Sequence, residues 1–466
     1  MIRILTLCLT LVAGTAHAAV EIEEVTSPGG IEAWLVEDHN IPFTALEIRI
    51  VGGAALDAPG KRGATNLMMA LLEEGADDLT AQAFQTRREE LAASYGFDAD
   101  DDMVAISAQM LTENRDEAVA LLRSALVAPR FDQDAVDRVR AQVLANIASD
   151  EKSPGDIASR ALDAAAFGDH PYGASLSGTV ESVTALTRDD IVVAHRATLT
   201  RDRVYVGAVG DITPEDLGAL LDDLLGDLPA ATVPLPDDAD YALTGGVTVI
   251  PYDTPQSVAL FGHRGITRDD PDYMAAYILN EALGAGGFES RLMQEVREER
   301  GLTYGISTFL VPQFYGELIL GQLGSSNSTM AEAIDVIRAE WARMATDGMT
   351  QEELDRVKTY LTGAYPLRFD GNASIATILV GMQVIDLPPS YVVDRNAQLN
   401  AVTLDDVNRV ARELLRPDDL RFVVVGQPEG LTGDPAPGGV LPQDAAPAPE
   451  TAPADAAPTE AAPAAD

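Results

Sequence analysis

The chain has 466 residues and a formal charge of −42, from 74 acidic and 32 basic side chains. This length suggests more than one domain, and an apolar fraction of 46 % allows each domain a packed core. Binding to nucleic acid or to an anionic membrane surface requires clustered Lys and Arg, so the acidic balance argues against both kinds of partner.

Both ends of the chain differ in composition from the part between them. Residues 1–18 place Arg3 before a short apolar run and end in the small-residue sequence AHA, which is typical of a secretory signal peptide cleaved after Ala18. The run is too short for a membrane span, which needs about 20 apolar residues. The only cysteine, Cys8, lies in this segment, so the mature chain is expected to have no disulfide. Residues 433–466 are rich in Ala, Pro, Asp and Glu, which predicts a disordered acidic tail.

The chain between these segments contains an internal repeat. Residues 184–191 and 202–210 match residues 400–407 and 418–426 at an offset of 216, and residues 133–139 match residues 351–357 at 218. Two matches at nearly one offset indicate a duplicated domain. A chance likeness between common helix and strand patterns is the alternative interpretation.

Local patterns in each copy predict both strands and helices. β-branched and alternating apolar runs predict strands at 45–51, 204–209 and 420–425. Helical patterns occur at 115–128, 133–149, 214–228, 330–346 and 351–365. We therefore expect an α+β fold in which each half is a sheet with helices on one face. The expected domains are 19–230 and 244–432, joined by a proline-rich acidic linker at 231–243.

Residues that bind metals or act as nucleophiles are sparse. Beyond the signal peptide the histidines are His39, His170, His195 and His263, and no two lie within five residues. Two zinc ligands on one helix must be about four residues apart to face the same way, so these histidines predict no zinc site. Each is interpreted as a surface residue or a hydrogen-bonded core residue. Neither a serine-hydrolase elbow nor a phosphate-binding loop is complete.

One stretch carries a family resemblance. Residues 286–305, with the sequence GGFESRLMQEVREERGLTYG, closely resemble the second-half signature of the pitrilysin/insulinase-type (inverted zincin) metallopeptidases. These include mitochondrial processing peptidases and bacterial periplasmic relatives. Residues 51–63, 129–131 and 167–173 agree with the first half of that family, so the resemblance covers about residues 20–430. It implies two similar halves that form a clamshell around a chamber and, with the signal peptide, a periplasmic location.

The resemblance also implies a zinc motif, H-x-x-E-H, on a helix after Gly63, with a third ligand about 76 residues further on. This sequence departs from the motif at every position. Asn66 and Ala70 replace the two histidines, Met69 replaces the catalytic base, and Asn146 replaces the third ligand. Neither Met nor Ala can bind zinc in place of histidine or move a proton at neutral pH. We therefore expect no metal or other cofactor on this chain.

The Arg/Tyr pair that the resembled family carries in its C-terminal half is present. In the resembled family an Arg and a Tyr seven residues apart reach the substrate carbonyl near the zinc, and Arg297 and Tyr304 have that spacing. A guanidinium and a phenol there stabilise the developing oxyanion. Arg300 is a competing cation with the wrong spacing, and a purely structural role for the pair is the alternative. The segment with Gly284, Gly286 and Gly287 is expected to be flexible and to contact substrate near the chamber entrance.

Lost ligands beside a retained Arg/Tyr pair predict a zinc-less subunit of a heterodimeric periplasmic peptidase. Its partners would be a homologous subunit that carries the zinc and a peptide substrate. The alternative is a peptide-binding or scaffold pseudoenzyme. An independent metallopeptidase would need ligands that the sequence does not supply.

Overall fold

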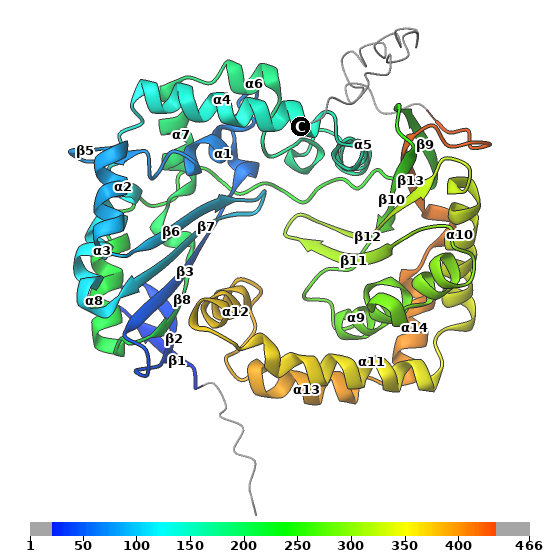
Figure 1. Ribbon diagram of the computed structural model, residues 1–466. Helices are drawn as coiled ribbons and strands as arrows, with labels where there is room; N and C mark the ends of the chain where they lie inside the picture. The colour runs from blue at the N-terminus through cyan, green and yellow to red at the C-terminus, as the bar shows by residue number, and fades with distance from the viewer. Residues whose placement is uncertain (1–20, 435–466) are drawn as a thin grey trace, which may run out of the picture.

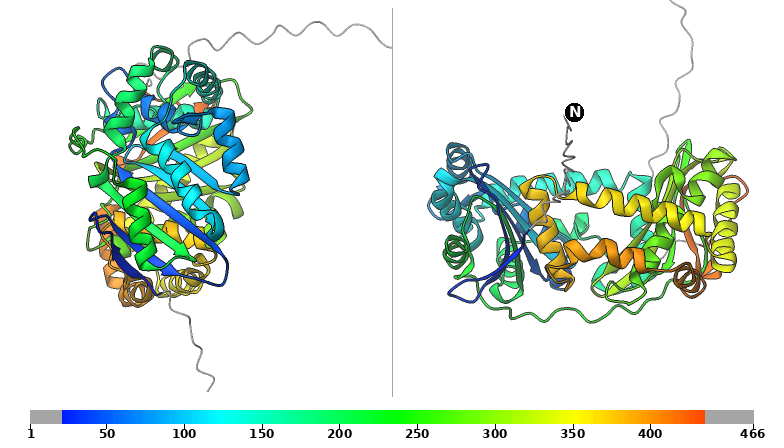
Figure 2. Two further views of the ribbon diagram at one scale, coloured as in Figure 1. Left: turned by 90° about the vertical axis from the view of Figure 1, so that its left-hand side faces the viewer. Right: turned by 90° about the horizontal axis from the view of Figure 1, so that it is seen from below.

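The computed structural model describes residues 21–434 and consists of two halves that face each other (Figures 1 and 2). Each half has a mixed sheet covered on its outer side by helices, and the two largest apolar cores lie between those layers. This confirms the predicted α+β fold with two halves. The predicted signal peptide and the predicted tail from residue 435 onwards lie outside the described residues.

The N-terminal half contains a six-stranded sheet in the order β1-β2-β8-β3-β7-β6, in which only β2 and β8 pair in parallel. Its strands are β1 (Glu23–Thr26), β2 (Glu32–Glu37), β3 (Phe43–Val51), β6 (Ser94–Ala99), β7 (Met103–Leu111) and β8 (Val204–Gly210), with a small separate pair β4 (Gly75–Ala76) and β5 (Leu79–Thr80). Its helices are α1 (Ala64–Met69), α2 (Ala81–Glu90), α3 (Arg115–Val127), α4 (Gln133–Asp150), α5 (Pro154–Phe167), α6 (Val180–Thr184), α7 (Arg188–Thr198) and α8 (Pro214–Leu225).

The C-terminal half contains a five-stranded sheet in the order β11-β12-β10-β13-β9, in which only β13 and β9 pair in parallel. Its strands are β9 (Gly246–Pro251), β10 (Gln256–Arg264), β11 (Ile306–Gln313), β12 (Gly316–Ser326) and β13 (Arg421–Gly426). Its helices are α9 (Tyr273–Asn280), α10 (Met330–Asp347), α11 (Gln351–Ala364), α12 (Asn372–Val384), α13 (Tyr391–Ala401) and α14 (Leu404–Leu414).

The two sheets have the same topology once β1 is set aside, which confirms the repeat seen in the sequence. β2, β8, β3, β7 and β6 correspond in order to β9, β13, β10, β12 and β11. The repeated helices α7 and α14 begin with the same capping box. The hydroxyl of Thr187 or Thr403 accepts a hydrogen bond from the backbone N–H of Asp190 or Asp406, and the carboxylate of that Asp accepts one from the backbone N–H of the Thr. The predicted strands and helices are confirmed to within a few residues. The helix predicted at 214–228 ends earlier, at Leu225, because a proline follows at position 229.

The inner faces of the sheets differ from the prediction of helices on one face only. Helix α5, from the N-terminal half, packs on β10 and β13 of the other half, and α12 packs on β8 and β3 in return. The two helices occupy equivalent places in the repeat, so each half lends one helix to its neighbour (Figure 1). Each sheet is apolar on its inner face as well, and the exchanged helix covers part of it.

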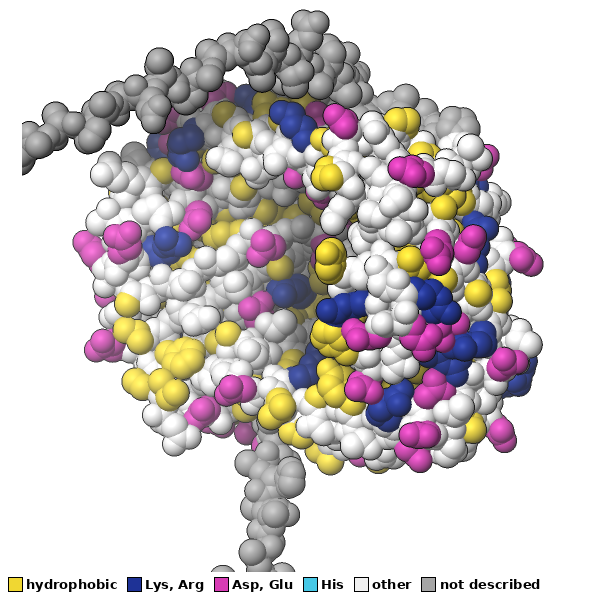
Figure 3. Space-filling view, turned by 45° about the vertical axis from the view of Figure 1, so that its right-hand side comes forward, with side chains coloured by type: hydrophobic (Ala, Val, Ile, Leu, Met, Phe, Trp, Pro, Cys, Tyr) yellow, Lys and Arg dark blue, Asp and Glu magenta, His cyan; other side chains and the backbone are white. Residues whose placement is uncertain are grey.

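A second contact joins the halves at the tips of two hairpins. Asp102, in the β6–β7 turn, accepts hydrogen bonds from the Tyr172 hydroxyl and from the backbone N–H of Phe314 (3.2 Å), in the β11–β12 turn. Tyr172 in turn accepts a hydrogen bond from the N–H of Tyr315 (3.1 Å). Burial raises the pKa of the Asp102 carboxyl to about 6. This contact and the exchanged helices hold the halves around the hollow visible in Figure 3.

Residues 226–245 contain no helix or strand and run between the halves as an extended segment (green in Figure 2). The segment is held by backbone bonds, such as Ala239 N–H to the Tyr315 carbonyl (2.7 Å) and Ala242 N–H to the Ala166 carbonyl (2.9 Å). Within residues 21–434, no helix is long and apolar enough to cross a membrane.

Candidate functional site

Helix α1, where the resemblance places the zinc motif, is short and firmly anchored. It begins at Gly63, whose φ of +97° is left-handed and whose added Cβ would lie 2.6 Å from the Ser177 carbonyl oxygen. The half-buried carboxylate of Asp57 accepts hydrogen bonds from the N–H groups of Gly63 (2.8 Å) and Thr65 (2.9 Å). The residues at the motif positions are therefore held on a fixed backbone.

These residues do not fit a zinc ion. Met69 is 1 % exposed and packs in the N-terminal core, whereas Ala70 is exposed and has no donor atom. Asn66 is half-buried, and the exposed Asn146 on α4 accepts a hydrogen bond from Gln142 (2.9 Å). Two neutral amides are a poor substitute for imidazole and carboxylate ligands. Across residues 21–434, no group of three or more His, Cys, Asp or Glu side chains is arranged to hold a metal.

Arg297 and Tyr304 lie on either side of a tight turn that leads into β11. Arg297 is in a π-helical turn (Met293–Glu298), which ends where the Gly301 N–H bonds to the Arg297 carbonyl (2.9 Å). Gly301 has a φ of +63°, which favours glycine at this helix end. The hydroxyl of Thr303 donates to the Gly324 carbonyl (2.6 Å) on β12 and accepts from the Gly305 N–H (3.1 Å). Tyr304 is thus carried by an anchored backbone.

The side chains of the pair are available for an external partner. Tyr304 is 86 % exposed. Arg297 stacks on Phe288, with 4.5 Å from its guanidinium carbon to the ring centre. Its one ion pair within residues 21–434 is a long one with Glu298 (3.7 Å). The competing Arg300 is engaged more tightly, in an ion pair with Glu295 (2.6 Å). No hydrogen bond or ion pair of residues 21–434 joins Arg297 or Tyr304 to the α1 positions.

The glycine run at 284–287 connects a π-helical turn to a short 3-10 turn at Gly287–Glu289. Residues Glu281–Ala285 continue α9 as a π-helical turn, and Gly284 is buried where a Cβ would meet Thr308 at 2.5 Å. A Cβ on Gly286 would lie 2.6 Å from the Glu281 carbonyl oxygen. These two glycines therefore serve close packing. Gly287 lines a cavity of about 460 Å³ beside β11 and β12, together with Phe288.

The histidines are surface residues or hydrogen-bonded core residues, as their wide spacing in the sequence suggested. His263 is 1 % exposed; its Nδ1 donates to the Arg264 carbonyl (2.7 Å) and its Nε2 accepts from the Trp341 indole N–H (3.0 Å). Burial lowers the pKa of His263 to about 4, so this imidazole is neutral at pH 7. His39, by contrast, is exposed and pairs with Asp211 (2.7 Å), which raises its pKa.

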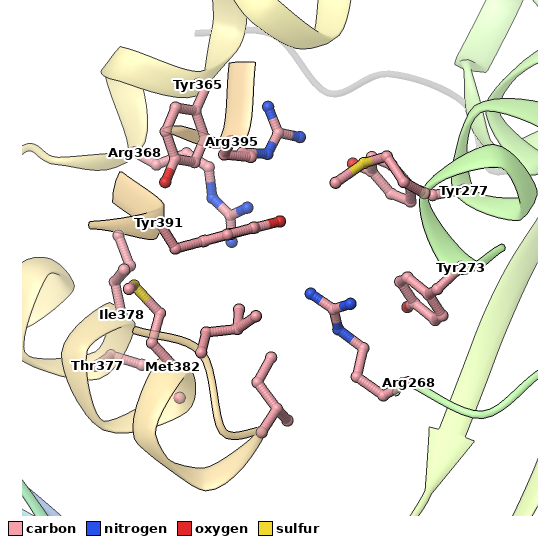
Figure 4. Close-up of a pocket in the computed structure, with 14 residues that line it drawn as sticks. Arg268, Tyr273, Tyr277, Tyr365, Arg368, Thr377, Ile378, Met382, Tyr391 and Arg395 are labelled. Atoms are coloured by element: carbon pink, nitrogen blue, oxygen red, sulfur yellow. The ribbon is translucent and has the colours of Figure 1, made fainter. Parts of the chain in front are cut away.

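A second cavity was missed by sequence reasoning. It lies between α9 and α12, has a volume of about 340 Å³ and is lined by tyrosines and arginines (Figure 4). Its arginines, Arg268, Arg368 and Arg395, are spread over more than one hundred residues and follow no motif. No sequence signal would have grouped them, because the exchange of α12 creates the cavity.

Comparison with known proteins identifies the family. Residues 33–180 match the family model described as insulinase (peptidase family M16), and residues 185–361 match the one described as peptidase M16 inactive domain. The fold, with two repeated α+β halves, is that of this class. The chain therefore belongs to the insulinase (peptidase M16) family.

Individual relatives carry names of both active and inactive proteins. The chain is 25 % identical over 425 residues to a Helicobacter pylori protein named non-peptidase homolog YmxG, covering 91 % of this chain and 98 % of that protein. It is 27 % identical to an uncharacterized zinc protease of Streptomyces coelicolor, covering 87 % and 90 %. A crystal structure of a peptidase M16 inactive domain from Pseudomonas fluorescens superposes with a TM-score of 0.82 at 28 % identity, covering 90 % of this chain and 100 % of that one. With its altered motif, this chain is an inactive-type member that lacks the family's zinc ligands.

Proposed function

We propose that the protein is the non-zinc-binding subunit of a heterodimeric periplasmic peptidase and lends Arg297 and Tyr304 to its partner's active site. One observation carries the proposal: α1 cannot hold a metal, yet an anchored backbone presents Tyr304 with 86 % of its surface exposed. A large aromatic side chain fixed in solvent gains little for stability. Its exposure is better explained by a ligand or partner that covers it.

The chemistry follows from the donors that the pair offers. The Tyr304 hydroxyl and the Arg297 guanidinium would donate hydrogen bonds to the carbonyl oxygen of the peptide bond to be cleaved. Such donors are worth about 3–4 kcal/mol each, because the oxygen gains charge in the transition state. The partner subunit would supply the metal and the general base. The cavity beside Gly287 and Phe288 would receive a substrate side chain next to the pair.

The sheets offer a way to hold the peptide. β6 and β11 are the edge strands of their sheets on the same side of each repeat. An extended peptide could add to one of these edges through backbone hydrogen bonds. The peptide would then be positioned before the pair acts, which is the contribution that a subunit without a metal can make.

Reconstitution with a zinc-bearing homologue from the same cell tests the proposal. Affinity purification of the tagged mature chain should recover a homologue that carries H-x-x-E-H in equal amount. In that complex, Arg297→Ala should lower kcat/KM for peptide cleavage by about 100-fold or more, and Tyr304→Phe by a similar factor. Tyr360→Phe, at a tyrosine on α11 that is 62 % exposed, is the matched control and should leave the rate unchanged. Normal activity of both pair variants would remove the catalytic role.

A second candidate is a peptide-binding or scaffold pseudoenzyme that takes no part in proteolysis. It is supported by the name of the Helicobacter pylori relative, a non-peptidase homolog, and by the altered motif of this chain. In that case the purified chain would bind peptide, no zinc-bearing homologue would co-elute, and the Arg297 and Tyr304 variants would behave like the Tyr360→Phe control.

A further inference from the structure

The cavity between α9 and α12 combines three cations with apolar walls. Arg268 precedes α9, Arg368 follows α11 and Arg395 lies on α13, while Tyr273, Tyr277, Tyr365 and Tyr391 surround them. Among residues 21–434, the side chains that line the cavity include no Asp or Glu. This absence is notable in a chain whose net charge is −42. The volume of about 340 Å³ falls at the lower end of the range for small-ligand sites, roughly 300–1,000 Å³.

The arginines are held by aromatic rings in place of carboxylates. Arg268 lies over Tyr273 at 4.2 Å and Arg395 over Tyr365 at 4.4 Å. Arg395 is 6 % exposed, and its Nη1 donates to the Leu361 carbonyl (3.2 Å) and the Asn396 side chain (3.1 Å). Within residues 21–434, no carboxylate lies within ion-pair distance of the three guanidinium groups. Glu281 lies close enough to Arg395 for their charges to interact, whereas no ion pair of residues 21–434 offsets the charges of Arg268 and Arg368.

Figure 4 shows how the polar groups lie. The guanidinium groups of Arg268 and Arg368 approach from opposite sides, and the hydroxyl of Tyr391 points into the space between them. Like charges that face each other repel, and a bound anion removes that repulsion while accepting hydrogen bonds from both. Apolar side chains such as Ile378, Met382 and Leu387 line the rest of the cavity, and a bare inorganic anion would leave them uncovered.

We infer that this cavity binds the carboxylate end of a ligand with an apolar body, and that its occupant is the C-terminal residue of a peptide. Arg268 and Arg368 would hold the carboxylate, and the apolar wall on α12 would cover the last side chain. A neighbouring cavity of about 560 Å³ shares Arg268 and Ile385 and leads to the β11–β12 turn, so the preceding residues have a path. The inference rests on the proposed peptide-holding role, but not on catalysis by Arg297 and Tyr304.

Calorimetric titration of the purified mature chain, without a partner, tests the inference. The probes are a hexapeptide that ends in Phe, as the free acid and as the C-terminal amide. The free acid should bind at least 10-fold more tightly, because the amide has no negative charge and only one acceptor oxygen for the two arginines. Raising the salt from about 0.05 to 0.5 M should weaken binding of the acid more than that of the amide.

Variants assign the effect to the cavity. Arg268→Gln with Arg368→Gln should bring the affinity for the free acid down to that for the amide. Arg412→Gln, at an exposed arginine on α14, removes one charge from the same half and should change nothing. Arg268 is only half-buried and Arg368 is exposed, so unchanged circular dichroism and melting are expected for the double variant. Equal affinities for acid and amide, or an unaffected double variant, would overturn the inference.

Two further results show whether the ligand is a peptide or a small acid, and test this inference separately from the proposed catalytic role. If N-acetylphenylalanine binds as tightly as the hexapeptide, the site takes a small carboxylic acid and the peptide assignment is overturned. Tyr304→Phe should leave the preference for the free acid intact, because Tyr304 does not line this cavity. Loss of the acid preference in Tyr304→Phe would contradict the separate carboxylate site. The proposed catalytic role is tested by cleavage rates alone, so either proposal can fail without the other.

Discussion

The two exchanged helices hold equivalent places in the repeat but make different junctions. Helix α5 buries Ala158, Ala161 and Leu162 against the C-terminal sheet, so the small side chains are on the helix. Helix α12 lies so close to the N-terminal sheet that a Cβ on Gly207 of β8 would stand 2.4 Å from the Ala376 carbonyl oxygen. The residue equivalent to Gly207 in the other sheet is Val423. Here the small residue is on the strand.

The difference teaches how a duplicated fold can divide its tasks. The α5 junction packs Phe167 against Tyr172 and closes the molecule at the hairpin tips. The far side of α12 is free of such packing and forms one wall of the arginine and tyrosine cavity. Helix α5 therefore joins the two halves, whereas α12 joins them and also lines a candidate binding site.

The largest effect is expected at the α5 junction. Leu162 is fully buried, so Leu162→Ala should destabilise the protein by about 2–5 kcal/mol through lost burial and a cavity. Urea unfolding followed by tryptophan fluorescence measures the change, since Trp34 lies in the N-terminal half and Trp341 in the other. Leu367→Ala, at a side chain 78 % exposed, is the control and should shift stability by less than about 0.5 kcal/mol. Similar losses in both variants would contradict the packing role of α5.

The C-terminal half should make its own pH-dependent contribution to stability through a buried histidine. His263 has Ile50 as its equivalent in the N-terminal half, and burial lowers its pKa to about 4. The unfolded chain binds this proton near pH 6.5, so the stability that depends on neutral His263 is complete above that pH and is lost as the pH drops from 6.5 towards 4. This contribution should reach on the order of 3 kcal/mol at about 1.4 kcal/mol per pH unit. It is measured as the difference between the wild type and His263→Gln, because the raised pKa values of Asp102 (about 6) and Asp163 (about 7) in the N-terminal half act in the opposite direction. Unfolding curves between pH 4 and 7.5 measure it.

His263→Gln should remove this acid-side loss while keeping an acceptor for Trp341. His39→Gln is the control, because Asp211 raises the pKa of His39 and its contribution has the opposite sign, being lost as the pH rises. The control should therefore retain the acid-side loss. An unchanged slope in His263→Gln would show that another group causes it.

A smaller effect is expected where α12 meets β8. Gly207→Ala places a methyl group against helix backbone, so we expect a loss of about 1–3 kcal/mol from overpacking. The variant should also weaken peptide binding in the adjoining cavity. Gly218→Ala on α8, where the new Cβ has ordinary contacts at 3.5 Å, should be neutral or stabilising by helix propensity. Equal stability of both variants would show that α12 can move away without cost.

The smallest effect compares the repeated helix caps. Thr187→Ala and Thr403→Ala should each cost about 1 kcal/mol, because each removes the hydroxyl that caps a helix. Asp190 keeps an ion pair with Lys61 (2.9 Å) after the change, so α7 should lose less protection in hydrogen exchange than α14. Greater loss in α7 would contradict this support from Lys61.

Sequence patterns predicted the local elements and the duplication well. The strand around Ile48 alternates because one residue in two faces the outer core, and the helices around α7 and α14 carry their caps in the sequence. The family resemblance placed Asn66, Met69 and Ala70 on a helix, and the structure has them on and at the end of α1. Such features depend on residues close together in the chain. They can be read without knowledge of the fold.

The sequence by itself thus determined the family, the repeated α+β halves and the absence of the family's ligands from α1. Only the tertiary structure decided the exchange of α5 and α12, the contact of Asp102 with the β11–β12 turn, and the cavity that collects Arg268, Arg368 and Arg395. The physical reason is distance along the chain. Periodicity fixes which face of an element is apolar, but the partner that covers that face is chosen by packing between segments hundreds of residues apart.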